Sequence, residues 1–346
     1  MKKPSYSQMR NLFNDAHVQA CINSRKAGVT STPYTLKSNN AKLSEALQEV
    51  ISALDFPTLL ENILDTPFFG FQPIEIFWEE SGDGLFGLVP SGFEAKPQEW
   101  FSLGKDGEIR LRTKSAPFDG EALLPFKFLC PIYRKSTEKP LGEALFDSVF
   151  APVNFKRGAV KFWGTFVEKY GMPWALGTIP RQTLDSEAIK FKEALENMVQ
   201  DGVAVYDDSC SVELVESGSK QGSSAVYRDF ISFQNDEISK AILGQTLTTE
   251  VQGSGSYALG RVHSQVRDDI LRGDIKLVQN AINTLIGYVL AVNGIEEGAR
   301  FEFVGEILVQ QERAARDKVL SDAGVKFSKE YFMRTYGFLE GDFLGD

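Results

Sequence analysis

Apolar residues recur three and four positions apart over several long stretches of this chain, a spacing that predicts amphipathic helices. The longest such run lies near the C-terminal end and steps by four, three, four, three and four residues through Leu271, Ile275, Val278, Ile282, Leu285 and Val289. Steps of this kind are typical of a helix packed along another element. We therefore predict that the helix beginning near residue 257 is the longest in the chain.

Helical spacing also appears in five earlier stretches. A first helix is expected at 5–27, and a second over the stretch that carries Leu43, Leu47, Val50, Ile51, Leu54, Leu60 and Ile63. Further helices are predicted at 143–170, 184–200 and about 226–244. Pro152 should kink or restart the helix at 143–170, because proline lacks the backbone N–H and clashes with the preceding turn.

Alternating patterns between residues 70 and 135 predict strands. In "PIEIFWEE", Ile74, Ile76 and Trp78 fall on one face and Glu75 and Phe77 on the other. Short strands are predicted at 85–90, 99–103, 108–113 and 126–133, with "GKDG" turning the second into the third. A smaller module, in which "WALGTI", "VAVY" and "CSVELVE" flank the helix at 184–200, completes an α+β chain.

Composition sets limits on function. The chain has 346 residues, of which 42% are hydrophobic and 24% charged, as in globular proteins. Its net charge of -10 argues against tight nucleic-acid binding over the whole surface, since lysine and arginine neutralise phosphates in such complexes. It shows neither the apolar core of a signal peptide nor a run of about 18 apolar residues, so we expect a cytoplasmic chain when made.

Residues that could carry catalysis or bind a metal are sparse. Three scattered cysteines, Cys21, Cys130 and Cys210, are expected to be reduced thiols, and only His17 and His263 could supply imidazole. Neither a P-loop nor a G-x-S-x-G motif occurs. Carboxylate pairs and the charged turns at 261–274 are interpreted as solvated surface with local ion pairs. We therefore predict no catalytic residue, no metal and no cofactor.

The stretch "TLTTEVQGSGSYALG" between two helical patterns leaves alternatives open. "GSGSYA" at 253–258 matches a variant of the dinucleotide fingerprint, which needs a strand before it and an acidic residue about 20 positions later. Here a helical pattern precedes it and Asp274 lies inside a predicted helix. A nucleotide-binding enzyme is therefore the second hypothesis, behind a structural or assembly protein.

Three blocks resemble the portal proteins of Mu-like tailed phages. The most specific runs from "ISKAILGQTLTTEVQGSGSYALG" to "LAVNG" at 238–294, and the others are "FWGTFVEKYGMPWALGTIP" at 162–180 and "PIEIFWEE" at 73–80. The resemblance implies a ring, typically of twelve subunits, at one capsid vertex, through which double-stranded DNA is packaged and ejected. It also implies the phage portal fold: an α+β wing, two long stem helices, a small α/β clip, a tunnel loop and a long wing helix.

The family layout implies boundaries for this chain. They are 1–142 for the wing, 143–170 and 223–245 for the stem helices, 171–222 for the clip, 246–256 for the tunnel loop, 257–306 for the wing helix and return strand, and 307–346 for a short crown. The crown is expected to be short or missing. The implied partners are further copies of the chain, double-stranded DNA read without sequence specificity, the terminase large subunit, head-completion or neck proteins and the major capsid protein, with no membrane.

The resemblance also implies functional residues. The tunnel loop would present small polar side chains to DNA from Thr246, Thr248, Thr249, Glu250, Gln252, Gly253, Ser254, Gly255 and Ser256. The clip would assemble with neighbouring subunits through Trp174, Leu176, Ile179, Val203, Val205, Val212 and Leu214. A loop that adapts to passing DNA needs permissive residues and no basic side chain, and Glu250 is the loop's one charge.

Overall fold

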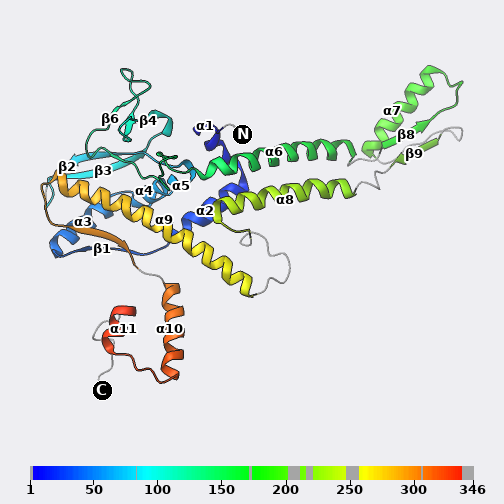
Figure 1. The fold of residues 1–346 in the computed structure, drawn as a ribbon. Coiled ribbons are helices and arrows are strands. Elements are labelled where there is room, and N and C mark those ends of the chain that lie inside the picture. Colours follow the sequence, from blue (N-terminus) through cyan, green and yellow to red (C-terminus); the bar gives the residue numbers. More distant parts are fainter. Residues whose placement is uncertain are drawn as a thin grey trace.

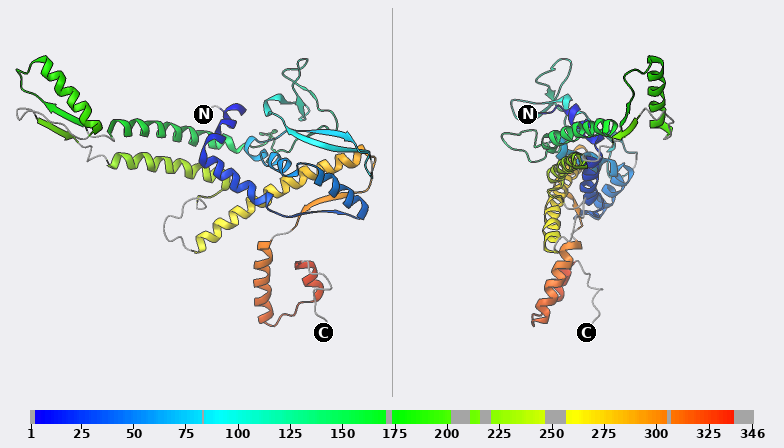
Figure 2. Two further views of the ribbon diagram at one scale, coloured as in Figure 1. Left: turned by 180° about the vertical axis from the view of Figure 1, so that it is seen from behind. Right: turned by 90° about the vertical axis from the view of Figure 1, so that its right-hand side faces the viewer.

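The computed structural model describes residues 3–82, 84–170, 174–201, 211–215, 221–246, 257–304 and 307–336. Figure 1 shows a body of helices and short strands from which two long helices, α6 (Leu145–Tyr170) and α8 (Gln221–Leu243), project side by side. A small module of one helix and two strands lies at their far end. Helices α10 (Ile307–Asp322) and α11 (Lys329–Tyr336) extend from another side of the body, as the two further views in Figure 2 confirm.

The remaining elements form the body, the small module and the extension of α10 and α11. The helices are α1 (Tyr6–Arg10), the 3-10 turn η1 (Asn11–Asn14), α2 (Ala16–Thr30), α3 (Ala41–Ala53), α4 (Phe56–Ile63), α5 (Thr66–Phe69), η2 (Gln98–Trp100), α7 (Asp185–Asp201), α9 (Tyr257–Val292), α10 (Ile307–Asp322) and α11 (Lys329–Tyr336). The strands are β1 (Tyr34–Ser38), β2 (Ile74–Glu80), β3 (Leu88–Ala95), β4 (Phe101–Leu103), β5 (Ile109–Leu111), β6 (Glu121–Ala122), β7 (Phe128–Leu129), β8 (Trp174–Thr178), β9 (Ser211–Val215) and β10 (Ala299–Phe303).

Side-chain caps divide the helices that the sequence pattern joined. The single helix expected at 5–27 is wrong: the chain forms α1, η1 and α2, because Asp15 leaves the helical conformation and its carboxylate accepts from the backbone N–H groups of His17 and Val18. The second expected helix is likewise split into α3 and α4. Asp55 caps α4 through Thr58 N–H, and Pro57 occupies its first turn, where no N–H is needed.

Gly70 ends α5 with a positive φ of 92°. A Cβ atom there would lie 2.9 Å from the carbonyl oxygen of Leu141, so the close approach of two chain segments excludes a side chain. By contrast, α6 continues through Pro152 as one helix, so the predicted restart at this proline does not occur.

Four small antiparallel sheets hold the strands in pairs and triplets. Their orders are β1-β10, β3-β2-β7, β4-β5-β6 and β8-β9. The hairpin predicted around "GKDG" is confirmed, with Phe101 opposite Leu111. The strand predicted at 85–90 begins later, at Leu88, and it pairs with β2 across an irregularity between Phe77 and Trp78.

Two buried clusters stabilise the body. One joins α3, α4, β2 and β10 to α9, and the other joins α1, α2 and α5 to the body-proximal halves of α6 and α8. The seam predicted on α9 is confirmed: Val278, Ile282, Leu285 and Val289 are buried, and Leu271 and Ile275 pack partly buried against them. Burial of these side chains is the main favourable contribution to such a body.

One helical stretch, Gln265–Val292 of α9, is long and apolar enough to span a membrane by length and composition. Many of its apolar side chains, among them Val278, Ile282 and Leu285, belong to the first buried cluster. The same composition is therefore explained by packing inside the body.

Candidate functional site

The antiparallel pair of α6 and α8 is the most prominent feature outside the body (Figure 1). Near the body the two helices are held by buried side chains, among them Val153 of α6 and Ile238 of α8. Farther out, the rings of Phe166 and Tyr227 pack with centroids 5.8 Å apart. The pair is therefore joined along its described length.

The outer part of the pair exposes large apolar side chains that the protein's own core does not cover. They are Phe155, Val160, Phe162 and Val167 on α6, and Val226, Phe230 and Phe233 on α8. Phe162 is 67% exposed. Isolated apolar side chains on a surface are ordinary, but a series along two adjacent helices indicates an interaction surface.

Helical geometry sorts these side chains into two different faces. With about 100° between successive residues, Phe155 and Phe162 fall on one side of the plane through both helix axes, and Val160 and Val167 fall on the other. Because the helices are antiparallel and meet at Phe166 and Tyr227, the α8 stripe of Val226, Phe230 and Phe233 falls on the side of Phe155 and Phe162. We call these the phenylalanine face and the valine face.

Two basic residues of α6 are engaged within the molecule. Lys156 forms an ion pair with Asp15 at 2.9 Å, and Arg157 donates to the backbone carbonyl of Asn11 at 2.8 Å. These contacts anchor α6 to η1 and α2. Lys156 and Arg157 are therefore held by groups of the same chain.

The far end of the pair carries the small module predicted at 171–222. Strands β8 and β9 run antiparallel with Trp174 opposite Val215, Ala175 opposite Leu214 and Gly177 opposite Val212, and α7 covers them. A Cβ atom at Gly177 would lie 2.5 Å from Phe191 and from Leu195 of α7, so helix and strand are in close contact. Leu176 lies in β8 and Ile179 directly after it, whereas Val203 and Val205 fall outside the described residues.

The predicted tunnel loop lies almost wholly outside the described part of the chain. Thr246 is described, and the remaining candidates, Thr248, Thr249, Glu250, Gln252, Gly253, Ser254, Gly255 and Ser256, are not. The structure does describe both flanking helices. Gly244 ends α8 with a φ of 70°, and a Cβ atom there would lie 2.9 Å from Val266 of α9, so α8 ends against α9.

A buried ion pair that the sequence interpretation missed joins these flanks. Arg25 of α2 binds Asp274 of α9 through two hydrogen bonds of 2.7 and 2.9 Å, and it donates to the carbonyl of Ile242 at the end of α8 at 2.8 Å. The side chains of Arg25 and Asp274 are 5% and 2% exposed. Asp274 is therefore not part of a solvated face, as the charged turns at 261–274 suggested.

The sequence contained a signal for this pair. Asp274 falls in phase with the seam, three residues after Leu271 and four before Val278, and Arg25 falls between Ile22 and Val29 on the buried stripe of α2. A charged residue in phase with apolar positions predicts a buried partner. Burial lowers the pKa of Arg25, but hydrogen bonds and the charge of Asp274 outweigh it, so the pKa lies above its ordinary value.

Other polar contacts also use α2 and its surroundings. His17 Nε2 lies 2.8 Å from the hydroxyl oxygen of Ser239 on α8, and burial followed by the charge of Lys156 lowers the pKa of His17. Lys26 pairs with Glu61 and Asp65, each at 2.9 Å. Through such contacts α2 is bound to α4, α6, α8 and α9.

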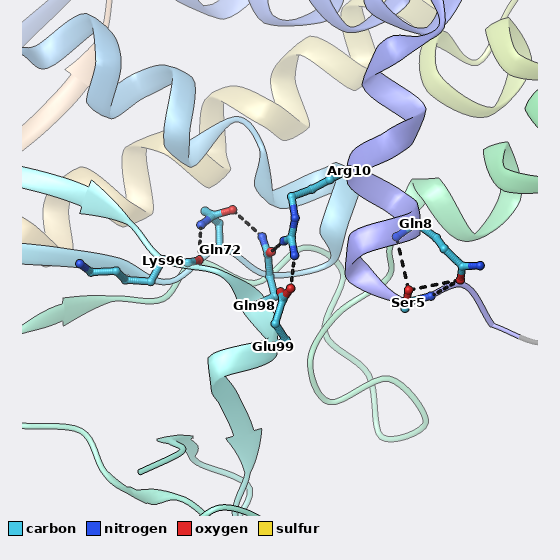
Figure 3. A network of polar contacts seen from close by, with 7 residues as sticks. All are labelled: Ser5, Gln8, Arg10, Gln72, Lys96, Gln98 and Glu99. Atoms are coloured by element: carbon cyan, nitrogen blue, oxygen red, sulfur yellow. Dashed lines mark hydrogen bonds and ion pairs between the residues drawn. The ribbon is translucent and has the colours of Figure 1, made fainter. Parts of the chain in front are cut away.

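A second network ties the N-terminal helix to the sheets (Figure 3). Arg10 donates to Gln98 at 3.1 Å and pairs with Glu99. Gln98 in turn donates to Gln72 at 2.6 Å, which donates to the carbonyl of Lys96 at 3.2 Å. Every member is occupied by another protein group, as expected of a network that stabilises structure.

The described residues offer little support for catalysis. They contain no group of three or more His, Cys, Asp or Glu side chains placed to hold a metal ion. Cys21 and Cys130 are free thiols, and burial raises the pKa of Cys130 to about 12. The helix α8 precedes "GSGSYA", and Asp274 is bound to Arg25 inside α9, so the acidic residue that a dinucleotide site requires is already engaged.

Curated relatives share sequence with most of this chain. The Mu-like prophage FluMu protein gp29 of Haemophilus influenzae is 26% identical over 303 residues, covering 84% of this chain and 58% of the relative. The portal protein of Escherichia phage Mu is 25% identical over 287 residues, covering 81% of this chain and 55% of the relative. The chain thus spans little more than half the length of these two relatives.

Solved structures share its fold at low identity. A chain in the virion of a native gene transfer agent particle aligns with a TM-score of 0.69 at 11% identity, covering 94% of this chain and 91% of that chain. A chain in the neck of the native particle computed with C12 symmetry aligns with a TM-score of 0.65 at 10% identity, with the same coverages. The α+β fold with a projecting helix pair is therefore shared with components of these particles.

A family model described as the portal protein of Mu bacteriophage matches residues 6–338, which is nearly the whole chain. The match includes the body, the projecting helix pair with its two apolar faces, and both helices that flank segment 247–256. The chain therefore belongs to the family of Mu portal proteins.

Proposed function

We propose that this chain is the subunit of a ring at one vertex of a phage capsid, through which double-stranded DNA enters and leaves. The observation that carries the proposal is the pair of different apolar faces on the two sides of α6 and α8. A head-to-tail interface joins two different faces of one subunit and closes into a ring when the rotation allows, whereas a two-fold dimer uses one face twice. In the ring, the phenylalanine face of each subunit packs on the valine face of its neighbour.

The C12 symmetry of the neck structure with the same fold supports a ring of twelve subunits for this chain. In this assignment α6 and α8 are the stem helices, the module of α7, β8 and β9 is the clip, and residues 246–256 are the tunnel loop. Residues 1–142 and α9 with β10 form the wing, and residues 307–346 belong to the crown. In the same assignment the clip is proposed to contact the terminase large subunit and later the neck proteins, and the wing is proposed to contact the major capsid protein.

DNA passes through such a ring without being gripped. Tight phosphate binding requires many lysine or arginine contacts, and this chain has a net charge of -10. Within the tunnel loop, Glu250 is the one charged residue. The proposed channel therefore guides DNA weakly and without sequence readout, in the virion and in the host cytoplasm during assembly.

The clip is proposed to assemble through strand pairing between subunits. Among the described residues, β8 and β9 form a sheet of only two strands, so each strand presents an open edge. A two-stranded sheet is marginal by itself, and open edges bind further strands. Trp174, Leu176, Ile179, Val203, Val205, Val212 and Leu214 are the residues proposed for this surface.

The proposal is tested by imaging the purified chain by negative-stain electron microscopy and measuring its mass by light scattering. Wild type should form rings with a central hole. Phe162→Ser combined with Phe230→Ser should yield mainly monomers, because it removes two aromatic side chains from the phenylalanine face. Phe118→Ser is the matched control: Phe118 is 84% exposed and lies in the loop between β5 and β6, so rings should persist.

Rings that survive the double replacement would contradict the assigned interface, and a monomeric wild type would contradict the ring itself. The competing nucleotide-binding enzyme predicts a different result. A tightly bound nucleotide must raise the melting temperature by mass action. A thermal shift with ATP or dinucleotides would therefore favour the enzyme, and its absence favours the ring.

A further inference from the structure

Arg25 contacts four separate parts of the body from one guanidinium group. Two of its nitrogens bind the two carboxylate oxygens of Asp274 on α9, at 2.7 and 2.9 Å. A third, Nη1, donates to the carbonyl of Ile242 at 2.8 Å, and Nη2 also lies 3.4 Å from the hydroxyl of Tyr133. The guanidinium packs over the ring of Phe68 with its carbon 6.0 Å from the centroid.

These contacts have a particular position in the chain. Ile242 is the penultimate residue of α8, and Asp274 lies in α9 on the other side of segment 247–256. The carbonyl of Ile242 is in the last turn of α8, where carbonyls have no partner within their own helix. One buried side chain on a third helix therefore satisfies the end of α8 and holds α9 at the same time.

The chemistry requires arginine at this position. Its planar fork offers five N–H donors in fixed directions and can bind both oxygens of a carboxylate while another nitrogen points elsewhere. Lysine would keep the charge but would not match this geometry. A buried ion pair is also replaceable by apolar side chains without loss of stability in some proteins, so its presence is not explained by stability alone.

We propose that Arg25 is a positioning residue that sets the placement of the last turn of α8 relative to α9, and through it the DNA-handling geometry of the ring. The placement of α8 relative to α9 concerns the described helices alone. The effect on DNA handling rests on the proposed function. Arg25 itself is assigned no contact with DNA.

The decisive variant is Arg25→Met combined with Asp274→Leu. Two apolar side chains of similar length fill the buried site and leave no unpaired charge, so the chain should fold, assemble and melt within a few degrees of wild type. The donor to Ile242 is lost. Hydrogen exchange measured by mass spectrometry on the full chain should then be about tenfold faster or more in peptides covering 238–246, and unchanged in those covering 150–160 of α6.

Two comparisons keep the result interpretable. Lys26→Met removes the neighbouring buried cation of α2, whose ion pairs and hydrogen bond go to Glu61 and Asp65, so exchange at 238–246 should stay as in wild type. Arg25→Lys keeps the positive charge and covers the case in which the double variant fails to fold. It should show intermediate exchange at 238–246. The proposal fails if the folded double variant exchanges at 238–246 as slowly as wild type. If the double variant does not fold, the same result in Arg25→Lys overturns the proposal.

The effect of Arg25 on DNA handling is measured as the amount of DNase-protected DNA in assembled particles. The double variant should form rings and yield several-fold fewer DNA-filled heads than wild type or Lys26→Met. Equal filling despite faster exchange would overturn the link to DNA handling. If wild type forms no ring, the proposed function fails, while the exchange experiment still decides the role of Arg25.

Discussion

Polar and charged side chains of α2 and of its N-cap Asp15 hold the helices of the body together. Asp15, His17, Arg25 and Lys26 each face a different neighbouring group, and their partners lie on α4, α6, α8 and α9 and at Asp65, directly before α5. Because a buried charge costs several kcal/mol when its partner is removed, such residues define one arrangement of the helices and disfavour others. The polar contacts of α2 are therefore more specific determinants of geometry than its apolar stripe.

His17 makes the stability of this arrangement dependent on pH. Its pKa is lowered from 6.5 in the folded chain, by burial first and then by the charge of Lys156. The unfolded chain therefore binds protons more tightly, and the stabilisation is present above about pH 6.5 and lost as the pH falls through 6.5 toward the folded pKa. The free energy of unfolding, measured with urea between pH 7.5 and 5, should decrease, and it should decrease less in His17→Gln.

The second histidine provides the control for this measurement. His263→Gln leaves His17 and its contact with Ser239 in place, so the decrease should persist. Carboxylates with lowered pKa values, such as Glu75, lose their contribution only below about pH 5. An identical pH profile for wild type and His17→Gln would show that His17 does not produce the effect.

At the scale of elements, α9 is the main packing helix of the body. Its seam joins the cluster of α3, α4, β2 and β10, and its N-terminal half reaches past the end of α8. The centre of the seam is buried, whereas Leu271 and Ile275 at its edge are only partly buried. The seam should therefore tolerate changes at its edge better than at its centre.

Replacing seam residues by alanine tests that expectation. Ile282 is fully buried, so Ile282→Ala should destabilise the fold by about 2 to 5 kcal/mol through lost contacts and a cavity. Ile275 is only partly buried, and Ile275→Ala should cost clearly less. Urea unfolding of both variants measures the difference. Equal costs would mean that the two positions are equally important for packing.

The clip is an element whose stability should depend on its neighbours. Its described sheet consists of β8 and β9 alone, covered on one side by α7. A fragment of residues 171–222 should therefore be unfolded as a monomer, or should associate, when followed by circular dichroism and light scattering. A fragment that is folded and strictly monomeric would contradict the proposed pairing of strands between subunits.

At the scale of the whole molecule, the elongated shape separates the buried core of the body from the exposed apolar surface of the projecting parts. The body contains the buried clusters, whereas the helix pair and the clip extend away from it with apolar surface exposed (Figure 2). A monomer gains nothing from such exposure, because exposed apolar area is favourable only when it is later covered. The shape is therefore better explained by assembly than by an isolated function.

Assembly would multiply the effect of one charge in the tunnel loop. Ser254→Arg would place one cation per subunit in the proposed channel, and a circle of cations should bind passing phosphates by counterion release. Packaging rate in an in vitro assay should fall, and it should fall more at 50 mM than at 200 mM salt. Ser254→Gln, similar in bulk but neutral, is the control. If both variants slow packaging equally and independently of salt, the bulk of the side chain and not its charge is the cause.

The periodicity of the sequence was sufficient to predict the α+β class, the seam of α9, the hairpin of β4 and β5, and the order of the long helices. These features depend on neighbours in the chain, since spacing of three and four residues or alternation places side chains on one face whatever surrounds it. The resemblance to portal proteins came from local blocks too, and the family match confirms it.

Tertiary structure decided what local patterns could not. Whether Asp274 lies in solvent or beside Arg25 depends on a helix about 250 positions away, and only the packed chain shows that Phe162 stays exposed while Val153 of the same helix is buried. Caps at Asp15 and Asp55 divided helices whose apolar spacing appeared continuous, because one side-chain hydrogen bond at the correct position outweighs a weak propensity. Pairing between distant residues and burial are properties of the packed molecule, so they became visible only there.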